Sequence, residues 1–174
     1  MFQKALTSLL CGSALCAVPI ILNAASVNKQ DAAFMKMAAE ADMMCAHLGQ
    51  MAEESASNMA VKDLGKKLVQ DHTMNYRELT ELASKTGETI PKAIEKRDDR
   101  EIVALGRDKG KAFDRAFLNH EVADHERLAK AFKEEAEHGQ DPEIKAFANK
   151  SLPTIESHLH EAEDLVKAKS SKKA

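Results

Sequence analysis

The chain lacks the residue patterns on which many enzymes and disulfide-rich extracellular domains depend. It has 3 cysteines, and Cys11 and Cys16 fall in an apolar N-terminal stretch, so Cys45 stands alone in the remainder. No disulfide can form within that remainder, which is unusual for a protein of an oxidising compartment. A Gly-rich phosphate loop, a Cys-x-x-Cys pair and a nucleophile elbow are also missing. Catalysis therefore has no positive support in the sequence, and the chain is more consistent with a protein that is not an enzyme.

A surplus of one charge is missing as well. The 25 Lys and Arg residues nearly balance the 28 Asp and Glu residues, and the formal net charge at pH 7 is −3. There is no basic stripe along the chain, which argues against nucleic acid as a partner. Residues 171–174 form a short basic tail, which we interpret as a solubilising end rather than a binding patch.

The first 25 residues are typical of an export signal. Lys4 supplies a positive start, an apolar run follows, and small residues offer cleavage after Ala24 or Ala25. An uncleaved membrane anchor is the alternative, because the apolar run approaches the ~20 residues that a membrane span needs. We expect a signal peptide over 1–25, one domain over 26–170, and a periplasmic or secreted protein without a membrane span after cleavage.

The chain after the leader predicts helix almost throughout. Ala, Glu, Lys, Leu and Met dominate, runs of β-branched residues are missing, and apolar residues recur at helical spacing. Asp31, Ser57 or Asn58, and Asp141 can serve as N-caps. Long helices are predicted over 31–56, 58–86, 111–138 and 142–168, and one short helix between 92 and 110.

These elements predict an all-α fold. Four long helices joined by two short links and one longer connection indicate an antiparallel four-helix bundle with one short extra helix in the middle connection. The longer connection fits a crossover of the ferritin-like kind. No fixed-period repeat is evident. The predicted core consists of Phe34, Leu48, Leu64, Leu68, Leu79, Phe113, Phe117, Leu128, Phe132, Ile144, Ile155 and Leu165.

Each predicted long helix carries one metal-compatible side chain in its apolar stripe. These side chains are Cys45, His72, His125 and His158. One ligand per helix, turned toward a common core, is how helical bundles build metal sites. The alternative is that each histidine is an ordinary core residue with a hydrogen-bond partner, and that the cysteine is a small buried hydrophobe.

Two more residues extend the candidate set. Glu121 lies one turn before His125, so the two side chains can reach one ion or each other. His47 lies two residues after Cys45 on a different face of the helix. The rotation of the first helix decides which of these two faces the core, and the sequence leaves that open.

An aspartate precedes two of the histidines, in Asp71-His72 and Asp124-His125. Each aspartate is rotated about 100° from the inner stripe, so it cannot easily bind the same inner ion. It can instead orient a group at the flank of the site.

Methionine is concentrated in the first part of the chain after the leader. Six of the seven methionines after residue 25 fall between Met35 and Met59. Thioether, imidazole and thiol together form a soft ligand set that suits Cu(I). Core packing is the alternative, because methionine is a good helix former and a flexible filler.

Four segments in order carry a resemblance to a known family. They are DAAFMKMAAEADMMCAHLGQMA, VKDLGKKLVQDHTMNYRELTELASKTGETIP, FDRAFLNHEVADHERL and DPEIKAFANKSLPTIESHLHEAEDL. The chain resembles the bacterial exported family named domain of unknown function 4142, often described as membrane or outer-membrane proteins and placed among ferritin-like folds. Two Asp-His pairs and a Leu-Pro…His segment make the resemblance specific. The histidines that match are His72, His125 and His158.

The first helix departs from the family pattern. Where the family usually has Glu-x-Glu before Leu-Gly, this chain has Cys45 and His47. If the family holds a metal with carboxylates and histidines, this member has exchanged hard oxygen ligands for softer ones. The exchange favours Cu or Zn over Fe.

The sequence thus predicts metal binding or metal-linked stress protection in the periplasm. The candidate metal ligands are His72, His125, His158, Glu121, Cys45 and His47. A non-catalytic structural or interaction module of the cell envelope is the alternative, and a redox enzyme is the least supported reading. Convergence of the three histidine rings would favour metal binding, whereas rings scattered along the bundle would favour the envelope module.

Overall fold

The computed structural model describes residues 27–94 and 99–171, so the predicted signal peptide and residues 172–174 of the basic tail lie outside the described residues. The described part is helical and has no strand. Its helices are α1 (Lys29–Ser55), α2 (Met59–Thr86), α3 (Asp99–Arg107), α4 (Gly110–His138) and α5 (Pro142–Ser171). None of these helices is long and apolar enough to cross a membrane. The predicted helical bundle is confirmed.

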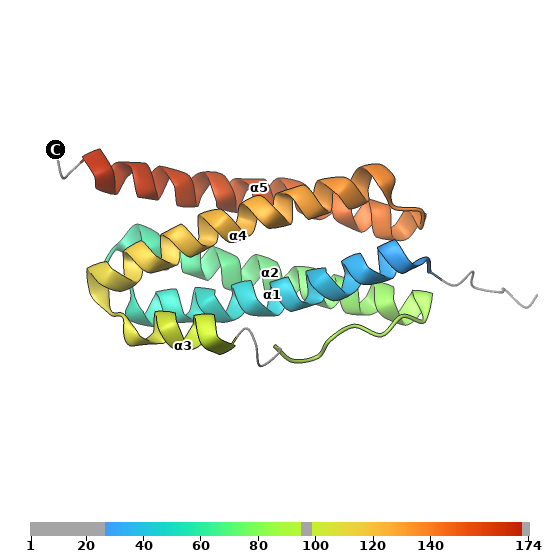
Figure 1. Cartoon of the computed structure of the whole chain (residues 1–174), viewed down its shortest axis with the longest axis horizontal. Helices are drawn as coiled ribbons and strands as arrows, with labels where there is room; N and C mark the ends of the chain where they lie inside the picture. Colours follow the sequence, from blue (N-terminus) through green and yellow to red (C-terminus); the bar gives the residue numbers. More distant parts are fainter. Residues whose placement is uncertain (1–26, 95–98, 172–174) are drawn as a thin grey trace, which may run out of the picture.

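The four long helices form two hairpins that pack side by side. Helices α1 and α2 form one hairpin and α4 and α5 the other, with α1 against α4 and α2 against α5 (Figure 1). Helix α4 begins beside the turn between α1 and α2, where Lys109 Nζ donates to Ser55 Oγ at 2.6 Å. Since α2 ends at the opposite end of the bundle, the connection that contains α3 crosses the whole bundle length (Figure 1).

The helix ends follow the local chemistry of the sequence, with one correction. Asn58 caps α2, Asp141 caps α5, and Gly87 ends α2 in the left-handed conformation with φ 74°. Asn28, not Asp31, caps α1, because the Asn28 side chain accepts hydrogen bonds from the first backbone N–H groups of that helix. The prediction of Asp31 as N-cap is therefore wrong.

Two buried aspartates, one in each hairpin, hydrogen-bond to the turn of the opposite hairpin. Asp31 accepts hydrogen bonds from the backbone N–H groups of Gln140 at 3.1 Å and Asp141 at 2.7 Å, in the α4–α5 turn. Asp114 accepts from the backbone N–H and hydroxyl of Ser57 at 2.9 and 2.8 Å, in the α1–α2 turn. Both aspartates begin the same short pattern, Asp-x-Ala-Phe, at 31–34 and 114–117. The two copies of this pattern thus make the same kind of contact, because each aspartate accepts hydrogen bonds from the turn of the opposite hairpin.

A polar layer divides the core into two apolar clusters. One cluster gathers around Phe34, Phe132 and Phe147, and the other around Phe113 and Phe117. The predicted core residues are buried except Leu165, which is half-buried near the end of α5. Along α2, α4 and α5 the residues of the two clusters lie on either side of the candidate histidine, whereas on α1 the clusters meet at Met44 and Cys45.

Two glycines let α1 and α2 approach closely near this layer. A Cβ on Gly49 would lie 2.6 Å from the Gly65 carbonyl oxygen, and a Cβ on Gly65 would lie 2.7 Å from that of Gly49. No side chain fits at either position without moving backbone. Because Gly49 is one turn from Cys45, this contact brings the helix that carries Cys45 close to the helix that carries His72.

Phe117 supplies the first test of this core. The side chain is fully buried and stacks on Phe113 with ring centroids 5.6 Å apart. We expect Phe117→Ala to lower the free energy of unfolding by about 3–5 kcal/mol, the usual range for deleting a buried ring, in denaturant titrations. Val103→Ala, at a half-exposed site, is the control and should change it by ~0.5 kcal/mol or less. A loss below about 1 kcal/mol in Phe117→Ala would contradict this packing.

Glu135 makes the stability depend on pH. Burial, together with the nearby charge of Asp31, raises the pKa of Glu135 from 4.5 to about 7. Between these values the native chain keeps a proton that the unfolded chain releases, so the free energy of unfolding falls as pH rises. Glu135→Gln should remove this fall, so the variant should gain stability relative to wild type between about pH 4.5 and about pH 8, measured by urea titration. Glu134→Gln, at an exposed neighbour, is the control, and a parallel pH profile for the two variants would contradict the assignment.

Candidate metal centre

Three histidine rings from three helices converge in the polar layer. His72 comes from α2, His125 from α4 and His158 from α5, and all three are nearly inaccessible to solvent. The ring centroids are 5.5 Å apart for His72 and His125, 5.4 Å for His72 and His158, and 5.5 Å for His125 and His158. The predicted convergence is confirmed, and the alternative of rings scattered along the bundle is wrong.

The spacing of the rings is that of a shared ion. An imidazole whose nitrogen binds a metal at about 2.0–2.1 Å has its centroid about 3.2 Å from the ion, so three such rings have centroids about 5.2 Å apart at tetrahedral angles and about 5.5 Å at trigonal angles. The three rings of this protein form a nearly equilateral triangle of 5.4–5.5 Å. The centroid spacing therefore permits one shared ion, and His72 and His125 already bring donor atoms within 4.8 Å of each other.

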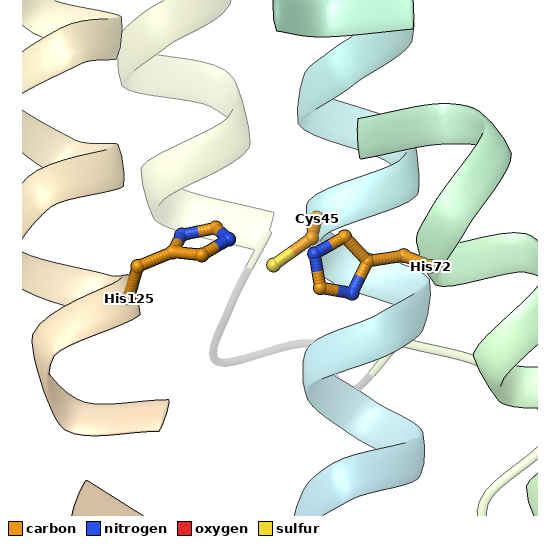
Figure 2. Close-up of side chains that lie close together, drawn as sticks. All are labelled: Cys45, His72 and His125. Carbon is orange, nitrogen blue, oxygen red and sulfur yellow. The ribbon is translucent and has the colours of Figure 1, made fainter. Parts of the chain in front are cut away.

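Cys45 on α1 supplies the fourth side of the cluster. Its sulfur lies between the rings of His72 and His125, whose Nε2 atoms point toward it (Figure 2). One donor atom from each of Cys45, His72 and His125 lies within 4.8 Å of the other two, and all three residues are buried. His158 stands outside this closest set of donor atoms, although its ring lies as near to the other two rings as they lie to each other.

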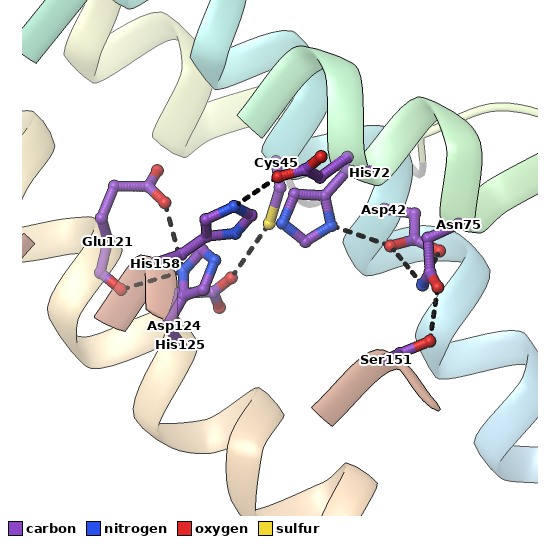
Figure 3. A network of polar contacts seen from close by, with 10 residues as sticks. Asp42, Cys45, His72, Asn75, Glu121, Asp124, His125, Ser151 and His158 are labelled. Carbon is purple, nitrogen blue, oxygen red and sulfur yellow. Dashed lines mark hydrogen bonds and ion pairs between the residues drawn. The ribbon is translucent and has the colours of Figure 1, made fainter. Parts of the chain in front are cut away.

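Each ring is held at one nitrogen by an anionic or carbonyl oxygen (Figure 3). His72 Nδ1 lies 2.8 Å from Asp42 Oδ1, and His158 Nε2 lies 2.9 Å from Asp71 Oδ2. His125 Nδ1 lies 3.1 Å from the carbonyl oxygen of Glu121 and 3.2 Å from its carboxylate. These oxygens only accept, so each facing nitrogen carries the hydrogen, and the hydrogen bond selects the tautomer and fixes the ring.

The opposite nitrogen of each ring has no hydrogen-bond partner. His72 Nε2, His125 Nε2 and His158 Nδ1 are buried, and no protein atom of the described residues donates to them. A buried acceptor without a partner costs about 1–3 kcal/mol, so three in one layer call for an explanation. Rings that donate from one nitrogen to a carboxylate or carbonyl and turn the other lone pair inward have the arrangement of metal-binding histidines.

A wider network holds Asp42 in place. Asn75 Nδ2 donates to both Asp42 oxygens at 3.0 and 2.9 Å, and Asn75 Oδ1 accepts from Ser151 Oγ at 2.5 Å (Figure 3). The chain of hydrogen bonds therefore ties α1, α2 and α5 together around His72. Sequence reasoning missed these three residues. The only available signal was spacing, since Asn75 lies one turn after His72 and Asp42 one turn before Cys45.

The aspartates that precede two histidines act at the flank of the site, as predicted. Asp71 holds His158 across the helix interface, not its own neighbour His72. Asp124 accepts a long hydrogen bond of 3.7 Å from the Cys45 thiol. Burial, and then the negative charges of Glu121, Asp124 and Asp42, raise the pKa of Cys45 well above its ordinary value. The thiol is therefore neutral. A metal cation bound beside it would favour its deprotonation.

The electrostatics differ between the histidines. Burial, followed by proximity to His72, lowers the pKa of His158 to about 4, so that ring is neutral at pH 7 with its inner lone pair free. Burial also opposes protonation of His125, but the hydrogen bond and charge of Glu121 outweigh it and raise the pKa of His125. Glu121 thus contacts Nδ1 of His125, on the side of the ring that faces away from Cys45.

His47 and the methionines lie elsewhere. Between the two candidates on α1, Cys45 faces the core, whereas His47 is half-buried and lines a surface pocket with Met43. Met35 packs in the core, as the packing interpretation of the methionines predicts, whereas Met59 is mostly exposed and does not follow it. Within the described residues, the donor atoms that lie within 4.8 Å of one another come from one thiol and two imidazoles, those of Cys45, His72 and His125.

Comparisons with known proteins agree with the helical bundle. No curated protein matches the chain significantly. The fold is similar to the crystal structure of a DUF305 fragment from Deinococcus radiodurans, with a TM-score of 0.72 and 14% sequence identity, over 83% of this chain and 99% of that chain. At that identity the likeness concerns the fold alone. The profile of one family matches residues 19–165, and the chain belongs to that family, which is described as Domain of unknown function (DUF4142).

Proposed function

We propose that this protein binds a transition metal ion in the middle of its bundle, with Cys45, His72 and His125 as ligands and His158 as the fourth. The observation that carries the proposal is the set of three buried ring nitrogens without hydrogen-bond partners, in a layer where His72 and His125 each bring a donor atom within 4.8 Å of the buried Cys45 thiol. The oxygen partners of the opposite nitrogens support it, because they hold each ring in the orientation and tautomer that a metal ligand needs.

The donor set favours Zn or Cu over Fe or Mg. Three imidazoles and one thiolate form a four-coordinate set of nitrogen and sulfur, which suits borderline and soft ions. Asp42, Glu121, Asp71 and Asp124 surround these ligands with negative charge, which would offset the positive charge of the ion. Binding would release the proton of Cys45.

A fully protein-bound site suits sequestration better than catalysis. Four protein ligands leave no position for a substrate, whereas catalytic zinc sites keep one open. We therefore place the protein among metal-sequestering bundles, with metal-linked stress protection as its role. The crossover connection supports a ferritin-like bundle, and the N-terminal leader in the sequence supports export to the periplasm.

Metal titrations test the ligand set. The chain, purified without chelators or a histidine tag, should bind Zn²⁺ or copper and unfold at a higher temperature when metal is added. His125→Ala and His158→Ala should each weaken binding at least about tenfold in titration calorimetry. His160→Ala is the matched control, because His160 lies two residues from His158 on the exposed face of α5 and should leave the affinity unchanged.

Two further results bear on the same titration. Affinity should fall as the pH drops, since protons compete with the metal for the His125 ring, whose pKa is raised, and for the Cys45 thiol. If neither ion binds tighter than about millimolar, the histidines are structural and the envelope-module function replaces metal binding. Equal affinities for His158→Ala and His160→Ala would remove His158 from the ligand set.

The Asp42 carboxylate supplies a separate prediction. Asp42→Asn keeps the size of the side chain but replaces the carboxylate with a neutral amide. The amide oxygen accepts a weaker hydrogen bond from His72 than the carboxylate does. We expect the metal affinity to fall by about 10–100-fold, the usual effect of losing a group that orients a ligand. Asp63→Asn, at an exposed site on α2, is the control for charge alone. Equal affinities in the two variants would show that Asp42 does not position a metal-binding ring.

A further inference from the structure

The buried cluster is reached from the surface along His72. This residue is only 3% exposed, yet its side chain lines two surface pockets on different faces of α2. An ion that enters the cluster has to pass between side chains, and these two pockets reach His72 from the surface. The proposed metal site therefore has two candidate routes of access.

The larger pocket carries metal-binding side chains. It has a volume of about 390 Å³ and lies between α1, α2 and the segment at Ala93 and Ile94. Met43 and His47 both line it, and because they are four residues apart on α1 they lie on the same helix face. A thioether and an imidazole so placed suit the same soft or borderline ions as the buried cluster.

The inner wall of this pocket is the Asp42–His72 pair. Both residues line the pocket, and they are joined by the 2.8 Å hydrogen bond that fixes the ring. The carboxylate attracts a cation, and no lysine or arginine is among the described lining residues. A rotation of the His72 ring away from Asp42 would turn a ring nitrogen toward an ion held at Met43 and His47.

The smaller pocket offers fewer soft donors. It has a volume of about 130 Å³ and lies between α2 and α5. Its charged lining residues are Asp71, Glu78 and Lys150, and the last two pair at 2.7 Å, so its charge does not distinguish it from the larger pocket. Met74 lines the same pocket and offers a thioether there, but among the described residues no imidazole besides His72 lines this pocket, which makes Met74 a natural control position.

We propose that the pocket between α1 and α2 is the access route of the metal site, in which Met43 and His47 capture a soft or borderline metal ion and pass it to His72. This inference rests on the proposed function and extends it, since it assigns His47 to capture rather than to the final ligand set. A capture site lowers the barrier for entry and for exit alike, so it changes rates and leaves the affinity constant.

Rapid-mixing kinetics with Co²⁺ test this proposal. Co²⁺ is a spectroscopic substitute for zinc, and its absorption with a thiolate ligand reports arrival at Cys45. We expect the uptake rate in the Met43→Leu/His47→Gln double variant to fall by about tenfold. The dissociation constant should stay unchanged. Met74→Leu should leave the rate as in the wild type, and the unfolding temperature of each metal-free variant checks that the bundle is intact.

The failures of the two proposals differ. An unchanged uptake rate in the double variant, with normal wild-type binding, would overturn the access route and leave the metal site in place. A weaker affinity at an unchanged uptake rate would also overturn it, because His47 would then belong to the bound state. Absence of the thiolate absorption in the wild type would overturn the proposed function, and the access route with it.

Discussion

The hydrogen bonds between imidazole and oxygen in the middle of the bundle are the interaction on which the rest of this structure depends. Asp42, Asp71 and Glu121 each hold one ring nitrogen of a buried histidine, and so decide where the opposite nitrogen points. Without these acceptors the rings would rotate to find other partners, since a buried donor or acceptor without one is expensive. The hydrogen bond at one nitrogen of each ring thus orients the nitrogen on the opposite side of that ring.

The ring nitrogens without partners in this layer destabilise the metal-free bundle. Packing and hydrogen bonds on both sides of the layer offset that cost. Two apolar clusters fill the halves of the molecule, and Asp31 and Asp114 tie each hairpin to the turn of the other. These ties lie far from the layer, at the two ends of the bundle. The ends therefore set the register of four helices, and the register sets the depth at which the three rings meet.

The same layer links the proposed metal site to the surface. Asp42 fixes His72, is itself fixed by Asn75, and lines the pocket that holds Met43 and His47. One carboxylate thus serves the ring and the proposed route. Cys45 and His47 stand at the two positions where the sequence departs from the acidic pattern of the family that it resembles. Cys45 lies in the cluster, and His47 lies at the pocket.

The sequence by itself determined the helices, most of the core and the one histidine that faces inward on each of three helices, because helical periodicity and capping are local properties. It also determined that Glu121 accompanies His125, one turn away on the same helix. Only the tertiary structure decided that Cys45 rather than His47 faces inward, that Asp71 serves His158, and that Asp42 and Ser151 join the network. These facts depend on helix rotation and on contacts between residues up to 87 positions apart in the chain. The periodicity of one helix does not define its rotation against its neighbours, since side-chain packing across the interfaces, down to the Gly49–Gly65 contact, sets it.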